Sequence, residues 1–330
     1  MKLGVLQFFS WPERRVDLAT VYARALERIE IMDQTGYDAV WLAEHHFSSF
    51  SVCPSVHMVG TLAAARTRRL RIGTAVSLAP FYHPLRLAEE VALLDLLSGG
   101  RVNWGAGRGF ARVEFTAFGV PPEESASRFR ETVEIVLRAW TDERLNFVGQ
   151  HFRFEDVEVL PKPTQLPHPP VWMAASSESA IEWAASRGFS ILMDPHSSSA
   201  EIGRKRRHYA EKLAAAGFSQ AGRDIPIARL VALAGSAGDA AAVARSGAEW
   251  IVNSYLGTQH RPVMQQSFTP AGADPIQRYL DDVILHGTPD KVAEEITRLR
   301  DEIDLDYLLC APLSHQSFML LTEQVLPRIA

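Results

Sequence analysis

The sequence predicts a single (β/α)8 barrel of the TIM type, and three observations lead to this fold class. Short runs rich in Val, Ile and Leu alternate with longer segments of helical period, as in a parallel sheet wrapped by helices. A chain of 330 residues fits one barrel domain, since barrels of this size commonly form one unit. The segment after the first apolar run, Phe9-Ser10-Trp11-Pro12, lacks the glycine fingerprint that a doubly wound nucleotide-binding fold carries at that place.

The expected strands are short apolar runs spread along the chain. They cover residues 3–8, 39–42, 71–77, 102–106, 171–174, 190–193, 228–233 and 307–311. Helical period predicts helices over residues 18–34, 55–66, 85–97, 127–140, 179–186, 200–215, 239–246, 289–300 and 317–329. Glycines are expected to end some of these helices, because the left-handed backbone after a helix favours glycine: Gly36, Gly99, Gly188 and Gly247.

Two stretches interrupt the alternation, at about 142–170 and about 256–278. The first is rich in proline, with strand-like pieces around Phe147 and Phe152, and the second is polar with glycine and proline. We expect both as insertions on loops that follow strands. Long irregular loops in compact domains commonly serve as lids, so the second is expected to be a mobile cover of the active site.

Charge and cysteine content exclude several classes of function. The chain has 34 basic and 39 acidic residues and a net charge of −5, without the positive excess that binds nucleic acid or anionic membranes. Cys53 and Cys310 lack the CxxC spacing of a metal or redox pair. No cleavage site follows the N-terminal apolar run, and no run approaches the ~20 apolar residues of a membrane span. We therefore expect a cytoplasmic protein whose partner is a small molecule.

A histidine pair follows the second expected strand. Glu44, His45 and His46 come at its carboxyl end, which is the catalytic face of a barrel. A histidine there exchanges protons near neutral pH, and an adjacent carboxylate can fix its tautomer. Ordinary hydrogen bonding within the loop is an equally open interpretation. Adjacent residues of an extended segment point to opposite sides, so the pair does not suit one metal ion, and no metal site is predicted.

Two other strand ends carry groups suited to a phosphate. Gly107 and Arg108 end the fourth strand, where glycine lets a ligand approach the backbone and arginine offers a forked donor. The fifth strand passes through Ala174 into a helix start with Ser176, Ser177 and Ser179, where free N–H groups favour an anion. A tight turn and ordinary N-capping are the alternatives for each segment alone. Because the two strands are neighbours, we interpret their ends together as a phosphate site.

Aromatic residues are frequent near the expected strand ends. They are Phe8, Phe9, Trp11, Phe47, Phe50, Phe81 and Phe110. Such a set suits an apolar or aromatic substrate, although core and loop packing accounts for at least half of it.

Taken in order, these motifs resemble the luciferase-like flavin-dependent monooxygenases. The resemblance rests on segments 43–47, 83–90, 94–101, 107–109 with Glu114 and 118–119, and 169–175 with 182–185. The matches keep their order from residue 3 to about 195 and return at 287–293, while 215–285 match poorly.

The resemblance implies a barrel that uses FMN in its reduced form (FMNH2) and O2, with a flavin C4a-hydroperoxide as oxidant and a separate reductase supplying FMNH2. His45 matches the family's catalytic histidine, and we place Glu44 with it. Arg108, Ser176 and Ser177 match the phosphate contacts, and Ala174 and Ser179 adjoin them.

The same resemblance extends to the flavin ring. Ala75 and Val76 match the segment under the isoalloxazine ring, where the family often has a non-prolyl cis peptide. Gly107 stands where the bacterial luciferase has a cysteine, so the expected activity is a monooxygenation without light. His83 is expected to cap a helix or, less favoured, to touch the flavin.

Several alternatives stay open. A deazaflavin-dependent reductase or dehydrogenase would use the same barrel, and a non-catalytic flavin-binding barrel or a metal-dependent hydrolase is further from the motifs. Family members are commonly dimers, and the apolar stretch 56–65 would suit such an interface, although core packing explains it equally well. The sequence names neither the substrate nor the type of oxygenation.

Overall fold

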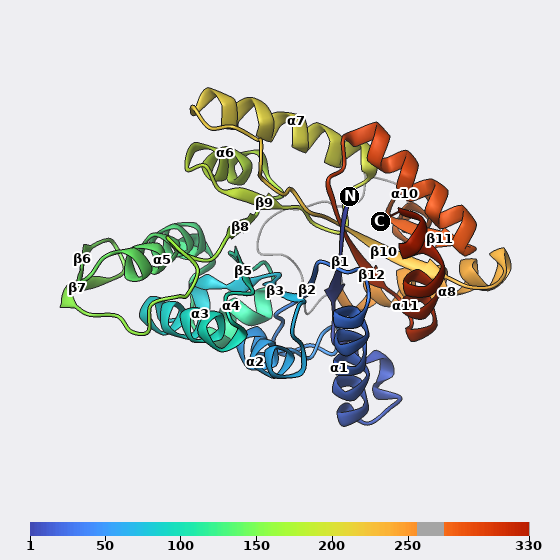
Figure 1. Ribbon diagram of the computed structural model, residues 1–330, viewed down its shortest axis with the longest axis horizontal. Coiled ribbons are helices and arrows are strands. Elements are labelled where there is room, and N and C mark those ends of the chain that lie inside the picture. The colour runs from blue at the N-terminus through green and yellow to red at the C-terminus, as the bar shows by residue number, and fades with distance from the viewer. Residues whose placement is uncertain (256–273, 330) are drawn as a thin grey trace.

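The computed structural model describes residues 1–255 and 274–329, and at its centre parallel strands close into a barrel (Figure 1). Of the ten strands in the main sheet, eight form the barrel, while β4 (Ser77–Leu78) and β11 (Ile284–Gly287) add to its edges. The barrel strands are β1 (Lys2–Gln7), β2 (Ala39–Leu42), β3 (Arg71–Thr74), β5 (Val102–Gly107), β8 (Val171–Ala174), β9 (Ser190–Leu192), β10 (Ile227–Leu233) and β12 (Tyr307–Pro312). An isolated parallel bridge between Met193 and Ile227 joins β9 to β10 and closes the ring. The predicted (β/α)8 fold is confirmed.

Helices surround these strands, as Figure 1 shows. In chain order they are α1 (Leu18–Gln34), α2 (Val56–Arg66), α3 (Pro84–Ser98), α4 (Arg112–Phe118), α5 (Ser125–Thr141), α6 (Glu178–Ser186), α7 (Ser199–Ala215), α8 (Ala237–Tyr255), α9 (Pro275–Arg278), α10 (Pro289–Ile303), α11 (His315–Leu320) and α12 (Leu326–Ile329). Short helical turns lie at Pro12–Arg14, Ala79–Phe81 and Pro122–Glu124, and π-helical turns at Tyr279–Val283 and Leu321–Val325.

Alternation along the strands divides the core into two parts. Val5 and Val40 pack in the cluster between sheet and helices, while their neighbours Leu6 and Trp41 belong to the cluster inside the barrel. The Trp41 indole N–H donates to the Tyr307 hydroxyl at 3.0 Å, and that hydroxyl donates to Asp38 at 2.7 Å. These large side chains occupy the amino-terminal end of the barrel, and the cavity described below lies at the other end.

The structure corrects the expected element list at β11. This strand pairs with residues 230–233 of β10 and was not predicted. The β9 strand ends at Leu192 and bridges β10 only near its start, so the second half of β10 would otherwise expose an unpaired edge. The sequence Ile-Leu-His-Gly is too short to be distinguished as a strand from its period.

Two of the four predicted glycine helix ends are wrong. Gly99 and Gly188 follow their helices with φ of 70° and 67°, as expected. Gly36 is not in the left-handed region, and α1 instead ends at an extended Thr35. Gly247 lies inside α8, where a Cβ atom would come within 2.5 Å of Leu313, so close packing against that side chain explains this glycine.

The segment 142–170 also differs from its predicted place. Its strand-like pieces form an antiparallel hairpin of β6 (Leu145–Val148) and β7 (Arg153–Val157), which extends outward beside α5 (Figure 1). Because α5 precedes the segment and β8 follows it, it is a helix-to-strand connection and not a loop after a strand. The expected cover over 256–278 lies outside the described residues as far as 273, and residues 275–278 form α9.

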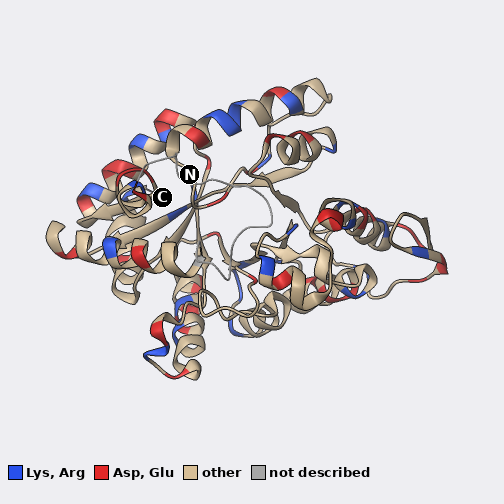
Figure 2. Ribbon diagram, turned by 180° about the vertical axis from the view of Figure 1, so that it is seen from behind, with Lys and Arg blue, Asp and Glu red and all other residues tan. Residues whose placement is uncertain are grey.

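Charged side chains of both signs are interspersed over the outer helices (Figure 2). Within the described chain, the helices are all too short or too polar for a transmembrane segment. Cys53 and Cys310 are unpaired and buried, and burial raises the pKa of each thiol to about 12.

Candidate active site at the carboxyl end of the barrel

A cavity opens among the loops that follow the barrel strands. Leu6, Ala228 and Leu309 line it from the barrel interior. All ten residues assigned to the site from sequence contribute to its lining: Glu44, His45, Ala75, Val76, Gly107, Arg108, Ala174, Ser176, Ser177 and Ser179. The position of strand ends predicted most of these residues, and the family resemblance predicted Ala75 and Val76.

One end of the cavity is suited to an anion. Strand β8 pairs with β5 and leads into α6, whose N-cap Ser177 accepts a hydrogen bond from the Ala180 N–H at 3.4 Å. Arg108, at the end of β5, lines the same space, and burial, followed by the positive charge of Arg130, lowers its pKa. Two arginines that line the cavity near a helix N-terminus and serine hydroxyls form a donor set for a phosphate dianion.

Arg130 was not predicted. It comes from α5, and its guanidinium lies 5.7 Å from the centre of the Trp183 ring, which also lines the cavity. Strand ends and the family resemblance predicted the site residues, and Arg130 lies on a helix, away from any strand end. Arg130 lies in α5, the second α-helix after β5, so its place in the sequence relative to the strand end gave no signal.

The middle of the cavity is bordered by backbone. The Ala75–Val76 peptide is cis, as the resemblance suggested. Gly107, on the neighbouring strand, lies so close to Val76 that a Cβ atom at this position would be 2.3 Å from the valine Cγ2. The absence of a side chain at Gly107 therefore accommodates Val76 in the cavity wall.

Glu44 does not orient His45, contrary to expectation. Its buried carboxylate accepts hydrogen bonds from His46 Nε2 at 3.0 Å, the Tyr82 hydroxyl at 2.9 Å and the Leu78 N–H at 3.4 Å. His46 is directed away from His45, as expected for neighbours on an extended segment, and packs edge-on against Phe118. The Glu44 network thus fixes the loop behind the cavity wall.

The carboxylate near His45 belongs to Glu114 instead. His45 Nδ1 lies 3.9 Å from Glu114 Oε1, and that oxygen accepts the His46 backbone N–H at 3.0 Å. The other oxygen, Oε2, is buried and has no hydrogen-bond partner among the described residues. The His45 ring is bordered by Phe8, Phe50 and Phe110.

The remaining predicted residues divide between cavity and packing. Of the seven aromatic residues, Phe8 and Phe110 line the cavity. His83 occupies the N-cap position of α3, but its side chain makes no capping hydrogen bond and packs between Phe152 and Phe154 of the hairpin.

The loop after β9 was missed altogether. Asp194, Pro195 and His196 line the cavity opposite β2 and β3. They directly follow a predicted strand, so the catalytic-face rule could have identified them. No group of three or more His, Cys, Asp or Glu side chains within 1–255 and 274–329 is arranged to hold a metal ion.

Comparison with known proteins settles the family. A family model described as luciferase-like monooxygenase matches residues 1–303. The chain belongs to the luciferase-like monooxygenases. The motifs from which the resemblance was drawn all lie within the matched residues.

Curated relatives match about half of this luciferase-like chain. A protein of Sinorhizobium fredii is 40% identical over 174 residues, which are 53% of this chain and 51% of that protein. The oxygenase component of a flavin-dependent trigonelline monooxygenase from Acinetobacter baylyi is 30% identical over 192 residues, 57% of this chain and 53% of that protein. The chain thus spans about half the length of the curated relatives that it matches.

Solved structures agree over the full length. The monooxygenase RslO1 from Streptomyces bottropensis has a TM-score of 0.87 and 28% identity, and the match covers 100% of both chains. An F420-dependent secondary alcohol dehydrogenase has a TM-score of 0.77 at 16% identity, covering 100% of this chain and 99% of that one, and this likeness shows the fold alone.

Proposed function

We propose that the protein is the oxygenase component of a two-component FMNH2-dependent monooxygenase. The observation that carries the proposal is one cavity lined by a phosphate-type donor set, by the closely packed Gly107 and Val76, and by His45 with Glu114 beside it. A cofactor that combines a flat ring system with a terminal phosphate would suit this cavity. Family membership supports the same choice.

The residues present fit FMN. Arg108, Ser176, Ser177 and Ser179, together with Arg130, would hold the phosphate by charge-assisted hydrogen bonds. Ala75, Val76, Gly107 and Ala174 would border the ring system. Bound reduced FMN would supply two electrons for activating O2, so that one oxygen atom enters the substrate and the other leaves as water.

His45 is the group that we assign to proton transfer. Glu114 beside Nδ1 favours a proton on that nitrogen, which leaves Nε2 to accept and release a proton toward the reactants. The aromatic rings around His45 restrict access of water. Glu44 contributes indirectly, since its hydrogen bond to His46 fixes the loop that carries His45.

The substrate is proposed to be a small apolar or aromatic compound. The cavity lining also includes the apolar side chains of Leu6, Phe8, Phe110, Leu192 and Met193. Gly107 offers no thiol in the cavity, which agrees with a reaction that emits no light. A separate reductase as partner is supported by the relative whose name specifies an oxygenase component.

The test compares the oxygen reaction of FMNH2 with and without the protein. Photoreduced FMN is mixed anaerobically with the protein and then with O2 in a stopped-flow instrument. We expect the flavin absorbance to return in two resolved phases, the second slow, because the cavity holds and shields the reacting flavin. Rapid single-phase reoxidation of flavin that is shown to be bound would overturn the oxygenase proposal and favour a deazaflavin-dependent reductase.

We also propose a homodimer formed through α2 and α3. Five large apolar side chains are exposed on these two helices: Met58, Leu62, Leu93, Leu96 and Leu97. An exposed apolar surface of this kind is typical of a protein interface.

A further inference from the structure

Two tryptophans and a tyrosine fill the barrel interior below the cavity. Trp172 of β8, Trp41 of β2 and Tyr307 of β12 belong to the cluster inside the barrel, and each is at most 5% exposed. The interior of such a barrel is usually filled by Val, Ile and Leu. Three aromatic side chains that carry polar atoms therefore depart from ordinary barrel packing, and we call them the aromatic series.

The aromatic series forms a continuous path of contacts. The ring centres of Trp41 and Trp172 lie 5.2 Å apart in an edge-to-face arrangement, and those of Trp41 and Tyr307 lie 6.3 Å apart. The Trp41 indole N–H donates to the Tyr307 hydroxyl at 3.0 Å. That hydroxyl donates to Asp38 Oδ2 at 2.7 Å. The path thus leads from two indoles through a phenol to a carboxylate.

Trp41 occupies space that two glycines leave free. A Cβ atom at Gly73, the residue paired with Trp41 on β3, would lie 2.3 Å from Trp41 Cδ2, and a Cβ atom at Gly105 would lie 3.5 Å from Cζ3. The indole therefore packs against the backbone of β3 and β5. Side chains on one face of a strand recur at every second residue, so the next positions on this face are Ala75 and Gly107. Both residues line the cavity.

Trp172 has the same relation to the cavity. It lies two residues before Ala174, or about 7 Å along β8. Ala174 lines the cavity as well. Ala75, Gly107 and Ala174 are residues that we propose to border the flavin ring. On three strands, the two indoles thus lie one position below the proposed place of that ring.

The other end of the aromatic series reaches a groove at the amino end of the barrel. Asp38 lines this groove together with Lys2 and Trp172. Burial, followed by the charge of Asp38, raises the pKa of Tyr307 well above its ordinary value, so the phenol keeps its proton in the resting protein. A phenol that loses an electron becomes a strong acid. Asp38 is placed to accept the proton that is then released.

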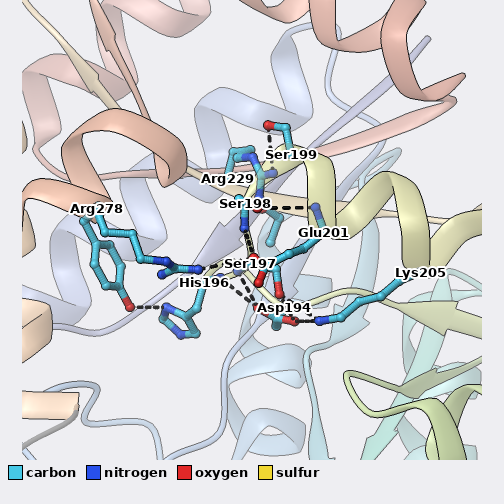
Figure 3. Close-up of polar contacts among 11 residues, drawn as sticks. Asp194, His196, Ser197, Ser198, Ser199, Glu201, Lys205, Arg229 and Arg278 are labelled. Carbon is cyan, nitrogen blue, oxygen red and sulfur yellow. Dashed lines mark hydrogen bonds and ion pairs between the residues drawn. The ribbon is translucent and has the colours of Figure 1, made fainter. Parts of the chain in front are cut away.

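The carboxylate in the opposite wall of the cavity is held by other contacts (Figure 3). Asp194 Oδ1 accepts the backbone N–H groups of His196 at 2.9 Å and Ser197 at 2.8 Å. Lys205 donates to Asp194 Oδ2 at 3.3 Å. These contacts fix the loop after β9, whereas Asp38 accepts from a phenol of the barrel interior.

We propose that Trp41, Trp172 and Tyr307 form an electron-transfer route that supplies one electron to light-excited, oxidised FMN in the cavity. Asp38 accepts the proton that Tyr307 releases. This inference rests on the proposed function, because that reaction binds the flavin in this cavity and leaves it oxidised after each turnover. An isoalloxazine ring that has absorbed blue light is a strong one-electron oxidant, and indoles and phenols are its usual donors in proteins.

The electrons and protons of this step balance. One indole gives up an electron to the flavin, and Tyr307 returns an electron to that indole. The Tyr307 O–H bond breaks as its proton forms an O–H bond with Asp38. The flavin thus gains one electron, the tyrosine loses one electron and one proton, and the aspartate gains one proton. The oxidising equivalent then resides at the amino end of the barrel, away from His45.

The experiment records the photochemistry of the FMN-saturated protein without O2 or substrate. A short blue flash excites the flavin, and transient absorption follows the tryptophanyl and tyrosyl radicals. We expect a tryptophanyl signal that is replaced by a tyrosyl signal, and a fluorescence lifetime of bound FMN that is severalfold shorter than that of free FMN. A lifetime equal to that of free FMN, or a flash that produces no tyrosyl signal, contradicts the proposal.

Variants of the tryptophans identify the donors. Trp41→Phe/Trp172→Phe should lengthen the fluorescence lifetime and abolish the tyrosyl signal. The matched control is Trp104→Phe, because Trp104 packs edge-to-face on Trp140 with ring centres 5.0 Å apart, but between the sheet and the helices. This control should leave both signals unchanged. The proposal is overturned if the double variant keeps the wild-type signals, or if the control changes them more than the double variant does.

Single conservative variants test the other end of the route and keep both indoles. Tyr307→Phe should leave a tryptophanyl signal that no tyrosyl signal replaces. Asp38→Asn, which keeps an acceptor oxygen without the negative charge, should slow the appearance of the tyrosyl signal and leave the fluorescence lifetime short. A full tyrosyl signal in Tyr307→Phe, or an unchanged rate in Asp38→Asn, would refute the role of the residue concerned.

Measurements in the dark keep this inference apart from the proposed function. FMN affinity is measured by calorimetry, and the reoxidation of FMNH2 is recorded without a flash. If FMN binds and reoxidises in two phases but the flash produces no radical signals, the electron-transfer route alone is refuted. If FMN does not bind, the proposed function fails, and this inference fails with it.

Discussion

Glu114 is shared by the two neighbouring histidines: its Oε1 lies 3.9 Å from His45 Nδ1 and accepts the backbone N–H of His46 at 3.0 Å. The side chain that faces His45 is thus provided by α4 and not by the adjacent Glu44. One carboxylate from a separate helix therefore lies beside both histidines.

The first prediction concerns this pair. His45→Ala should slow substrate oxygenation by about 10²- to 10⁴-fold, the usual loss when a general acid or base is removed. Glu114→Gln should cause a smaller loss, about tenfold, because it removes the charge beside Nδ1 and keeps the shape. FMN affinity should stay unchanged in both variants, as measured by fluorescence titration. Unaltered turnover in His45→Ala would refute the assignment.

The second prediction concerns the phosphate end of the cavity. Arg108→Met should weaken FMN binding by roughly tenfold to a hundredfold, the range for one charge-assisted hydrogen bond, and leave riboflavin binding unchanged. The comparison of FMN with riboflavin by calorimetry isolates the phosphate. Equal weakening of both ligands would show that Arg108 acts through the ring or the fold. Arg130→Met should behave in the same way and serves as a matched second variant.

The third prediction uses the contact between Gly107 and Val76. Gly107→Ala should destabilise the fold by about 1–3 kcal/mol through overpacking, because the added Cβ meets the valine Cγ2. The double variant Gly107→Ala/Val76→Ala removes that methyl group and should recover most of the loss. Urea denaturation of the single and double variants measures the coupling. Strictly additive effects would mean that this contact does not dictate the glycine.

The fourth prediction is a pH dependence of stability. Burial lowers the pKa of His196 to about 4 in the folded chain, from its ordinary value of 6.5. Between these values the unfolded chain binds the extra proton, so the free energy of unfolding should fall as the pH falls from about 6.5 to about 4, by at most about 1.4 kcal/mol per pH unit. Asp194, whose pKa is also lowered, loses its contribution only below its ordinary value of 3.8.

The control for this pH effect is His196→Gln. Its free energy of unfolding should vary less than that of the wild type over the same range, as measured in urea at a series of pH values. Parallel pH profiles for the two proteins would show that His196 takes up its proton without opposing the fold.

The fifth prediction concerns assembly. Leu93→Glu/Leu97→Glu places charges on the exposed face of α3, where these side chains are 48% and 58% exposed, and should convert a dimer to monomers. Leu166→Glu, at a side chain that is 89% exposed outside α2 and α3, should leave the dimer intact. Sedimentation velocity distinguishes the species. A wild-type protein that sediments as a monomer contradicts the proposed interface.

The sequence was most informative where local rules apply. Short Val-rich and Ile-rich runs predicted all barrel strands. The carboxyl ends of these strands predicted many of the residues that line the cavity. Period and spacing say nothing of contacts between distant segments, so Glu44 was chosen for His45 by adjacency, while Glu114 holds that place through the fold. Arg130 was missed because it reaches the cavity from the side of a helix.

His196 shows a different limit. Its segment, Asp-Pro-His after β9, carries no recognisable motif, and its side chain contacts Tyr279, which lies 83 residues further along the chain. The strand β11 was not predicted for a related reason. It pairs with an edge of β10, and the sequence pattern of a short segment does not show pairing between distant strands.

The isolated bridge between Met193 and Ile227 makes the barrel unequal around its circumference. The side that borders the proposed flavin is a continuous ladder from β2 through β3 and β5 to β8, whereas the side that carries His196 is joined by one bridge and by side chains. Substitutions beside the junction of β9 and β10 can therefore change the shape of the cavity for a different substrate while the residues proposed to bind the cofactor stay in place. One chain can in this way keep its chemistry while its choice of substrate drifts.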